Sequence, residues 1–182
     1  MLTWDDIKGL CDCGAGILWL PRGYTEVPPE GRALVMLPNV YQEFCHGTWF
    51  APAGEPSART RERKASLRLV LERYVKGHHL NLNRDIKELG TKKINAAMRG
   101  CWEFRSHPPK EETRLFGFFA RPGAFIAVSF QARGKFVTQN DWQVQRNLCH
   151  GYWNSLTGTV PYMTGPWPVL LSADLAEYTE RK

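Results

Sequence analysis

The sequence lacks the short motifs by which nucleotide-binding and zinc-binding proteins are most easily recognised. Neither a GxxxxGK(S/T) loop nor a GxGxxG loop occurs, so the chain has no sign of a P-loop or a dinucleotide-binding turn. Its five cysteines include no CxxC pair, although Cys45 and Cys149 each precede a histidine and Cys11 and Cys13 are separated by one residue. Structural zinc sites usually combine a CxxC-type half with a matching second half. We therefore predict no metal and no other cofactor, and interpret the cysteines as free thiols.

Long apolar runs and a basic N-terminal segment are also missing. No run approaches the roughly 20 apolar residues that span a bilayer, and the first residues, MLTWDDIKG, carry acids where a signal peptide is basic. We therefore expect no membrane partner and no secretion. An odd number of cysteines without framework spacing is typical of a reduced, cytoplasmic chain. With 43% hydrophobic and 23% charged residues over 182 positions, the composition indicates one globular domain, or a small domain with extensions.

Charge is present in excess, and it is unevenly distributed. The net charge is +6, but residues 1–56 hold three Lys/Arg against seven Asp/Glu, a balance of −4. Residues 57–105 hold thirteen against five, a balance of +8, and residues 106–182 hold eight against six, a balance of +2. A basic middle segment favours a nucleic acid or an acidic protein as partner. The alternative is a solvated basic face without a dedicated ligand.

The stretch from Gly100 to Phe136 contains the strongest strand signals. Its three runs rich in aromatic and β-branched residues predict strands at Trp102–Arg105, Thr113–Phe119 and Ala124–Phe130. Arg121-Pro122-Gly123 supplies turn residues between the last two, which predicts a hairpin. Further strands are expected nearer the N-terminus, at Ile17–Leu20, Ala33–Leu37 and Val40–Phe50.

Helical spacing precedes and follows this stretch. Leu67, Val70, Leu71 and Tyr74 form one apolar stripe, which predicts a helix over Arg59–Lys76 that ends at Gly77. A second helix is expected over Arg84–Arg99, with a break near Gly90. Capping-box pairs predict two more helices, Trp4–Leu10 after Thr3 and a helix from Thr138 to about Cys149. A last short helix is expected over Ser172–Glu180. Residues 151–168 are expected to be irregular.

These elements predict an α+β fold. The helices over residues 59–76 and 84–99 are expected to pack on one face of an antiparallel sheet of at least three strands, and the N-terminal strands to extend that sheet. We expect residues 1–56 to fold against the basic region, because segments of about 40 residues seldom fold alone. Their role is either to modulate that region or to complete its core.

Basic side chains near the ends of the predicted strands indicate a site for a polyanion. Metal-free RNA cleavage needs a group that accepts the 2′-hydroxyl proton, a group that protonates the leaving 5′-oxygen, and cations beside the phosphate. His107 is able to transfer protons near neutral pH, and arginine pairs well with phosphate oxygens. The alternative is that the strand-end charges only discourage edge-to-edge aggregation. The predicted catalytic residues are Arg105, Arg114, Arg133, Lys135 and His107.

The basic region before and at the start of the sheet is the predicted nucleic-acid-binding surface. Its positive charge comes from two clusters, one in each predicted helix. The residues assigned to it are Arg61, Arg63, Lys64, Arg68, Lys92, Lys93 and Arg99.

The order of two helices, GCWEFR, RLFGFF, FIAVSFQARGKF and a capped helix resembles the RelE/ParE toxin superfamily of bacterial toxin–antitoxin systems, in particular its HigB-like, phage-derived branch. The resemblance covers about residues 57–150. Arg105 matches the arginine that ends the first hairpin strand of that branch, Arg114 the arginine that opens the next, and Arg133 and Lys135 the basic cluster after the last. Many nuclease members carry a lysine in the first strand, where this chain has Glu103. The family's C-terminal acid has candidates here in Tyr152, His150 and His107.

The resemblance implies a small fold with helices against an antiparallel sheet, and a choice between two activities. One is ribosome-associated cleavage of mRNA by an endoribonuclease that a cognate antitoxin neutralises. The other is non-catalytic inhibition of gyrase or of another nucleic-acid machine. A third possibility is a binding protein of a phage or mobile element that has lost catalysis. On this interpretation residues 1–56 form an acidic extension, 57–150 the core domain, and 151–182 a Gly/Pro/aromatic tail.

Overall fold

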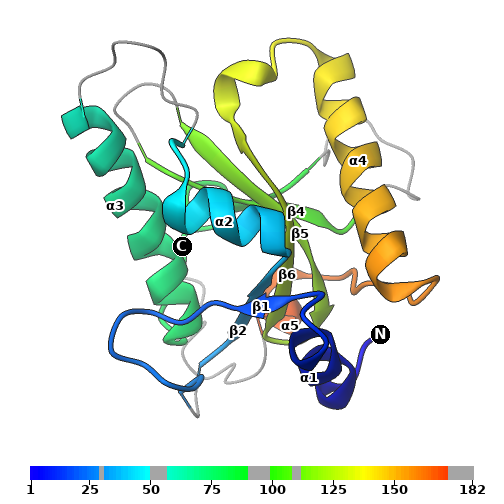
Figure 1. Cartoon of the computed structure of the whole chain (residues 1–182). Coiled ribbons are helices and arrows are strands. Elements are labelled where there is room, and N and C mark those ends of the chain that lie inside the picture. The colour runs from blue at the N-terminus through cyan, green and yellow to red at the C-terminus, as the bar shows by residue number, and fades with distance from the viewer. Residues whose placement is uncertain (29–30, 50–56, 90–98, 108–111, 172–182) are drawn as a thin grey trace.

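The computed structural model describes residues 1–28, 31–49, 57–89, 99–107 and 112–171 (Figure 1). Within these residues the fold is α+β, with helices packed around a mixed six-stranded sheet. The strand order is β1-β2-β6-β5-β4-β3. Their bounds are β1 (Ile17–Leu18), β2 (Ala33–Met36), β3 (Ile86–Glu88), β4 (Cys101–Arg105), β5 (Thr113–Arg121) and β6 (Ala124–Ala132).

The three strands predicted between Gly100 and Phe136 are confirmed and form the antiparallel centre of the sheet. β5 and β6 are joined by a tight turn in which Gly123 has a φ of 70°, a backbone conformation that glycine adopts without strain. β4 pairs with the other side of β5. β2 lies beside β6 in parallel, so part of the N-terminal segment belongs to the same sheet.

Helices cover both faces of the sheet, and the predicted helix over residues 59–76 packs on one of them as α3 (Ser57–Val75). α2 (Pro38–His46) and α3 pack on one face, and α1 (Trp4–Asp12) and α4 (Gln139–Thr157) on the other (Figure 1). The cause is the alternation of side chains along each strand. In β4, Trp102 and Phe104 point to the first face while Cys101 points to the second, so the central strands are apolar on both sides.

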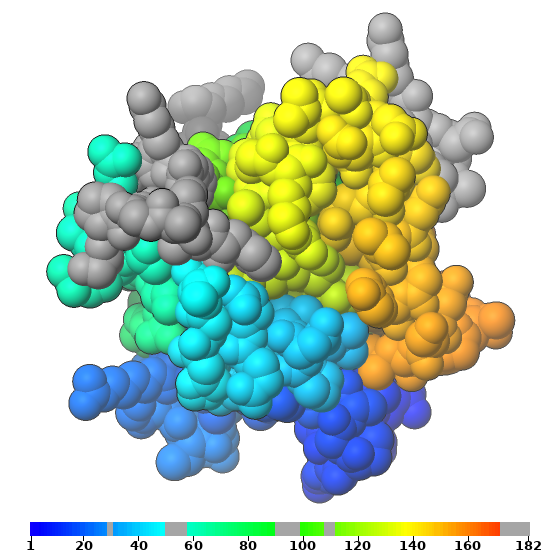
Figure 2. Space-filling view, turned by 45° about the horizontal axis from the view of Figure 1, so that its top comes forward, coloured from blue at the N-terminus to red at the C-terminus, as the bar shows by residue number. Residues whose placement is uncertain are grey.

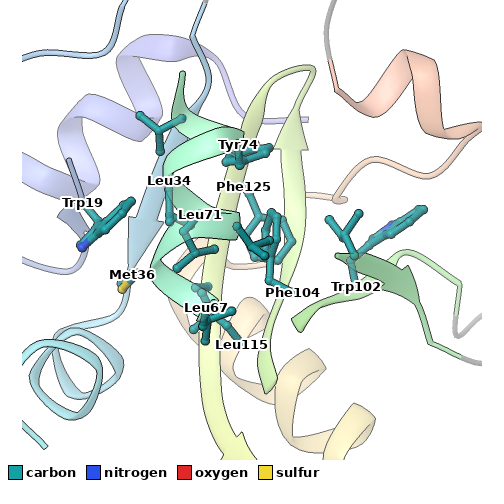
Figure 3. Packing of buried hydrophobic residues seen from close by; sticks show 14 of the residues in the cluster. Trp19, Leu34, Met36, Leu67, Leu71, Tyr74, Trp102, Phe104, Leu115 and Phe125 are labelled. Carbon is teal, nitrogen blue, oxygen red and sulfur yellow. The ribbon is translucent and has the colours of Figure 1, made fainter. Parts of the chain in front are cut away.

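The core under α3 is built from the predicted apolar stripe. Leu67, Leu71 and Tyr74 are fully buried, and Figure 3 shows them stacked over the sheet. The Tyr74 ring contacts Phe104 and Phe125 edge-on, with ring centroids 5.1 and 6.5 Å apart. This packing fixes α3 relative to β4 and β6. The short α5 (Trp167–Leu170) adds to the same cluster, stacking Trp167 on Trp102.

The strand predicted over Val40–Phe50 is wrong, because residues Pro38–His46 form α2. Proline is well tolerated in the first turn of a helix. Val40 and Phe44 stand one turn apart and both face the core, whereas the sequence pattern had favoured extended chain with aromatic anchors.

The helix predicted over Arg84–Arg99 is wrong at its start. Ile86–Glu88 form β3, which pairs antiparallel with β4 and covers that edge of the sheet. Residues 90–98 of that prediction lie outside the described residues, as does the helix predicted over Ser172–Glu180. α4 begins at its predicted capping box but continues past Cys149 to Thr157, so the first part of the segment expected to be irregular is helical.

Among the described residues, no helix has the length and apolar character required to span a membrane.

Candidate nucleic-acid interface

The sheet register places the predicted catalytic residues at one end of the molecule. Arg105 ends β4 opposite Arg114 on β5, and Arg114 lies opposite Gln131 near the end of β6. The backbone N–H of Arg133 donates to the carbonyl of Glu112 over 2.7 Å, which holds the segment after β6 beside the start of β5. We call this end of the sheet, where β4 and β6 finish and β5 begins, the basic end.

Arg114 is buried inside the basic end rather than exposed on it. Its guanidinium lies against Glu103, with Nε 3.3 Å from Oε2, and also contacts Glu112. Arg105 contacts the other oxygen of Glu103 over 3.0 Å. The side chains of Arg114 and Glu103 are 2% and 1% exposed. Two arginines therefore neutralise one buried carboxylate in β4.

Burial affects the protonation of both members of this pair. It raises the pKa of Glu103, and the nearby Arg114 and Arg105 charges act in the opposite sense. It lowers the pKa of Arg114, while Glu103 raises it. Each charge stabilises the ionised form of its partner and so offsets the effect of burial on the partner's pKa. Both residues are therefore needed to keep the buried pair ionised.

Arg133 and Lys135 lie on a 3-10 turn, η2 (Arg133–Lys135), that follows β6. Arg133 stacks on Trp142 of α4, with its guanidinium carbon 5.1 Å from the ring centroid, and donates to the carbonyl of Phe136. Lys135 is exposed and donates to the side chain of Gln131. Both cations are thus tied to the sheet–α4 side of the basic end.

His107 follows β4 and is held by a carboxylate. Its Nε2 lies 2.7 Å from Oδ1 of Asp85, a buried residue in the loop before β3. A carboxylate can only accept, so Nε2 is the donor of this contact and, in the neutral ring, the lone pair is on Nδ1. The backbone N–H of His107 donates to Oγ of Ser66 on α3 over 2.8 Å. With 25% of its side chain exposed, the imidazole is oriented by protein yet reachable from solvent.

Asp85 is the centre of this cluster. Its Oδ2 accepts from the backbone N–H of Asn81 over 2.8 Å and pairs with Arg73 of α3 over 3.2 Å, while its carbonyl accepts from the N–H of Arg105. Asp85, Arg73 and Ser66 were not predicted as site residues from the sequence. Asp85 and His107 are 22 positions apart, and no motif connects them.

The basic residues predicted on α3 differ in how far their side chains are exposed. Arg61 and Arg68 are exposed and Lys64 is half-buried, whereas Arg63 is buried. Lys64 donates to the carbonyl of Gly47, and Arg68 lies over the Phe44 ring of α2. The described residues lining an open hollow here are Arg61, Lys64, Ala65, Arg68, Leu69 and Glu72. Arg99 is exposed, and Lys92 and Lys93 lie outside the described residues.

The α3 cations and the His107 cluster lie on different flanks of the same helix. Lys64 and Arg68 face α2, whereas Ser66 and Arg73 face the loop before β3 and the segment after β4.

In the described part of the chain, the adjacent cysteine–histidine pairs belong to no group of three His, Cys, Asp or Glu side chains of the kind that holds a metal ion. All five cysteines are free thiols. His150 lies on α4 and packs against the rings of Phe118 and Tyr162, where burial and the Arg146 charge lower its pKa. Tyr152 lies on the outer side of α4 and is 41% exposed.

No protein-family model, curated protein sequence or solved structure matched this chain significantly.

Proposed function

We propose that the chain binds RNA at the basic end of the sheet and cleaves it as a toxin-type endoribonuclease. The observation that carries the proposal is the Asp85–His107 contact of 2.7 Å, which orients a partly exposed imidazole beside the positive charge of Arg73. A histidine held by a carboxylate is a common arrangement for proton transfer.

The orientation of His107 defines the chemistry that it offers. Nε2–H donates to Asp85, so Nδ1 is available to take the proton of a ribose 2′-hydroxyl. The freed 2′-oxygen attacks the adjacent phosphorus, the bond to the 5′-oxygen breaks, and that oxygen takes up a proton from water. Asp85 stabilises the His107 imidazolium that forms when the 2′-hydroxyl loses its proton, and the imidazolium then returns this proton to solvent. Arg73 and Arg105, 32% and 23% exposed, add positive charge near the phosphate.

Binding of the rest of the strand is assigned to the exposed cations of α3. Arg61 and Arg68 present guanidinium groups that pair with phosphate oxygens irrespective of base sequence. Lys135 supplies a further cation at the end of β6. This division gives α3 the binding role and His107 the catalytic role.

The resemblance to the RelE/ParE superfamily supports the finer parts of the proposal. These are a RelE-like relationship of the core, mRNA on the ribosome as the substrate, and neutralisation by a cognate antitoxin in the cytoplasm. The order of β4, β5 and β6, with arginines at the start of β5 and the end of β4, is what supports that relationship.

A second function is favoured by one observation. Arg114, which matches the toxin superfamily's strand-opening arginine, is buried against Glu103 and Glu112. An arginine in these ion pairs stabilises the fold and does not contact a phosphate. This favours a non-catalytic inhibitor or interaction protein, directed at gyrase or another nucleic-acid machine.

The deciding experiment incubates the purified chain with mRNA, with and without ribosomes, in the presence of EDTA. The proposal expects cleavage products that end in 2′,3′-cyclic phosphate or 3′-phosphate. Inhibition of DNA supercoiling without any RNA cleavage would select the second function. Products with 5′-phosphate ends that appear only with added metal would contradict the His107 mechanism.

A further inference from the structure

The α4 helix carries a buried guanidinium without a counter-charge. Figure 2 shows α4, in gold and orange, on the surface of the molecule, whereas the Arg146 side chain of this helix is only 3% exposed. Its Nη2 donates to Oε1 of Gln143 over 2.6 Å, and its Nε donates to the carbonyl of Trp142 over 3.4 Å. Within the described residues no carboxylate forms an ion pair with Arg146. A cation in this state is costly, because burial removes its hydration and no opposite charge compensates for the loss.

Two buried polar atoms of α4 lack a hydrogen-bond partner. One is Nη1 of Arg146 and the other is Nε2 of His150. The two residues are four positions apart, so their side chains are neighbours on one side of the helix. Burial lowers the pKa of His150, and the nearby Arg146 charge lowers it further. Buried polar atoms are rarely left unpaired in folded proteins, so both atoms are available to bind an acceptor that comes from outside the chain.

The titratable groups of the neighbouring elements do not supply the missing negative charge. Burial raises the pKa of the Cys101 thiol on β4 well above its usual value, and the opposing effect of Arg146 is smaller. Burial also raises the pKa of Tyr162, whose ring lies beside His150 with the centroids 5.4 Å apart. Both groups are therefore neutral near pH 7. Glu88 of β3 accepts from a backbone N–H just before β4 and forms no ion pair with Arg146.

The chemistry of the two unpaired atoms indicates an oxyanion as the missing group. The planar guanidinium of arginine presents N–H donors in a geometry that matches the oxygens of carboxylate and phosphate groups. Neutral imidazole is able to donate from Nε2 when Nδ1 carries the lone pair. The rings of Phe118 and Tyr162 pack against His150 and limit the access of water. Charge-assisted hydrogen bonds are stronger in such a place than in water.

We propose that Arg146 and His150 form a binding site for a small oxyanion, a phosphate or a carboxylate group, between α4 and the start of β4. The anion accepts from Nη1 of Arg146 and from Nε2 of His150, and it neutralises the buried charge. The site lies on the face of the sheet that α4 covers, whereas the His107 cluster lies on the side of α3. It does not depend on the proposed RNA chemistry.

The test compares the urea stability of the unmodified chain and of Arg146→Met, which removes the charge and keeps most of the side-chain volume. In chloride buffer the variant is expected to be at least as stable as the unmodified chain, because it buries no uncompensated cation. Inorganic phosphate, added at constant ionic strength, is expected to stabilise the unmodified chain in a saturable way and to leave the variant unchanged. Equal stabilisation of both chains overturns the proposal.

A parallel series with acetate distinguishes the two kinds of oxyanion. Saturable stabilisation by phosphate alone assigns the site to a phosphate group, and stabilisation by acetate alone assigns it to a carboxylate. In either case the effect is expected to be absent from Arg146→Met. If neither anion stabilises the unmodified chain beyond the effect of chloride, the proposal is overturned.

Binding at exposed cations is separated from this site by calorimetric titration and by NMR. His150→Phe is expected to weaken anion binding about tenfold, because one charge-assisted hydrogen bond is lost. Arg61→Gln combined with Arg68→Gln removes exposed cations of α3 and is expected to leave the affinity unchanged. In the unmodified chain, the side-chain N–H resonances of Arg146 are expected to shift along the same saturation curve, a measurement that requires no variant. Resonances that stay unchanged while the anion binds assign the binding to surface cations and overturn the proposal.

Discussion

The guanidinium of Arg114 lies against the carboxylate of Glu103, Nε to Oε2 3.3 Å, and both side chains are almost completely buried. Removing one member of a buried ion pair costs about 3–5 kcal/mol, and in Arg114→Met the remaining contact of Arg105 with Glu103 offsets part of this cost. We therefore expect Arg114→Met to lower the free energy of unfolding by up to that amount in urea denaturation. Arg61→Met, on the exposed side of α3, is expected to change it by less than about 0.5 kcal/mol.

A double variant separates the ion pair from general packing. Glu103→Leu combined with Arg114→Met is expected to be more stable than the sum of the two single effects predicts, because neither charge is then left alone. Additive effects would show that the two groups are not coupled. A loss of activity in Arg114 variants is interpretable only together with these stabilities.

The second prediction concerns His107. Because Asp85 orients its imidazole, His107→Gln is expected to lower the rate of RNA cleavage about 10²–10⁴-fold while the affinity for RNA stays within a factor of two. The cleavage rate is measured under single-turnover conditions, and the affinity for RNA by fluorescence anisotropy. His78→Gln, at an exposed position after α3, is the matched control. Unchanged cleavage in His107→Gln would remove this residue from the mechanism.

The strands and helices that the sequence predicted correctly are those with local signals. The capping boxes at Thr3 and Thr138 placed the starts of α1 and α4, and the stripe from Leu67 to Tyr74 placed α3. β4, β5 and β6 follow from dense aromatic and β-branched runs. Local patterns of this kind depend on neighbours within a few residues, so a single sequence contains them.

What failed depended on contacts between distant parts of the chain. Ile86–Glu88 form a strand because they pair with the otherwise unpaired edge of β4. Pro38–His46 form a helix because this conformation places Phe44 in the core between α3 and the sheet. At the site, the cations at the strand ends were predicted, but the burial of Arg114 was not. That burial depends on Glu103 of β4 lying on the same face of the sheet as Arg114 of β5, which only the strand register shows. Asp85 was missed because only the fold brings it to His107.

The third prediction tests the exposed cations of α3 as phosphate contacts. Each such contact releases counterions, so loss of one lowers the slope of log affinity against log salt by about 0.7 for a single strand. Arg61→Gln combined with Arg68→Gln is expected to lower the slope by about 1.4, measured by anisotropy with single-stranded RNA at several salt concentrations. Arg22→Gln, exposed in the loop between β1 and β2, is expected to leave the slope unchanged.

The fourth prediction is a pH dependence of stability from His150. Its pKa is lower in the folded chain than in the unfolded one, chiefly because of burial and then because of Arg146. As the pH falls below about 6.5, the unfolded chain therefore takes up the proton first, and the free energy of unfolding decreases. His150→Gln is expected to reduce this decrease between pH 7.5 and 5.5 in urea titrations. His78→Gln is expected to retain it, and equal pH profiles for both variants would contradict the assignment.

The last prediction concerns the acidic N-terminal segment. β2 lies between β1 and β6, and Leu34 and Met36 are fully buried in the core that α3 covers. A chain that begins at Val40 loses this strand and leaves one side of β6 unpaired, which invites edge-to-edge association. We expect that truncation to aggregate, and Leu34→Ala to cost about 2–5 kcal/mol in urea denaturation. Leu18→Ala, at a position 38% exposed, is expected to cost much less. A soluble truncation that binds RNA more tightly at low salt would instead show that the segment regulates the basic region electrostatically, because exposed charges are screened over about 8–10 Å at physiological salt.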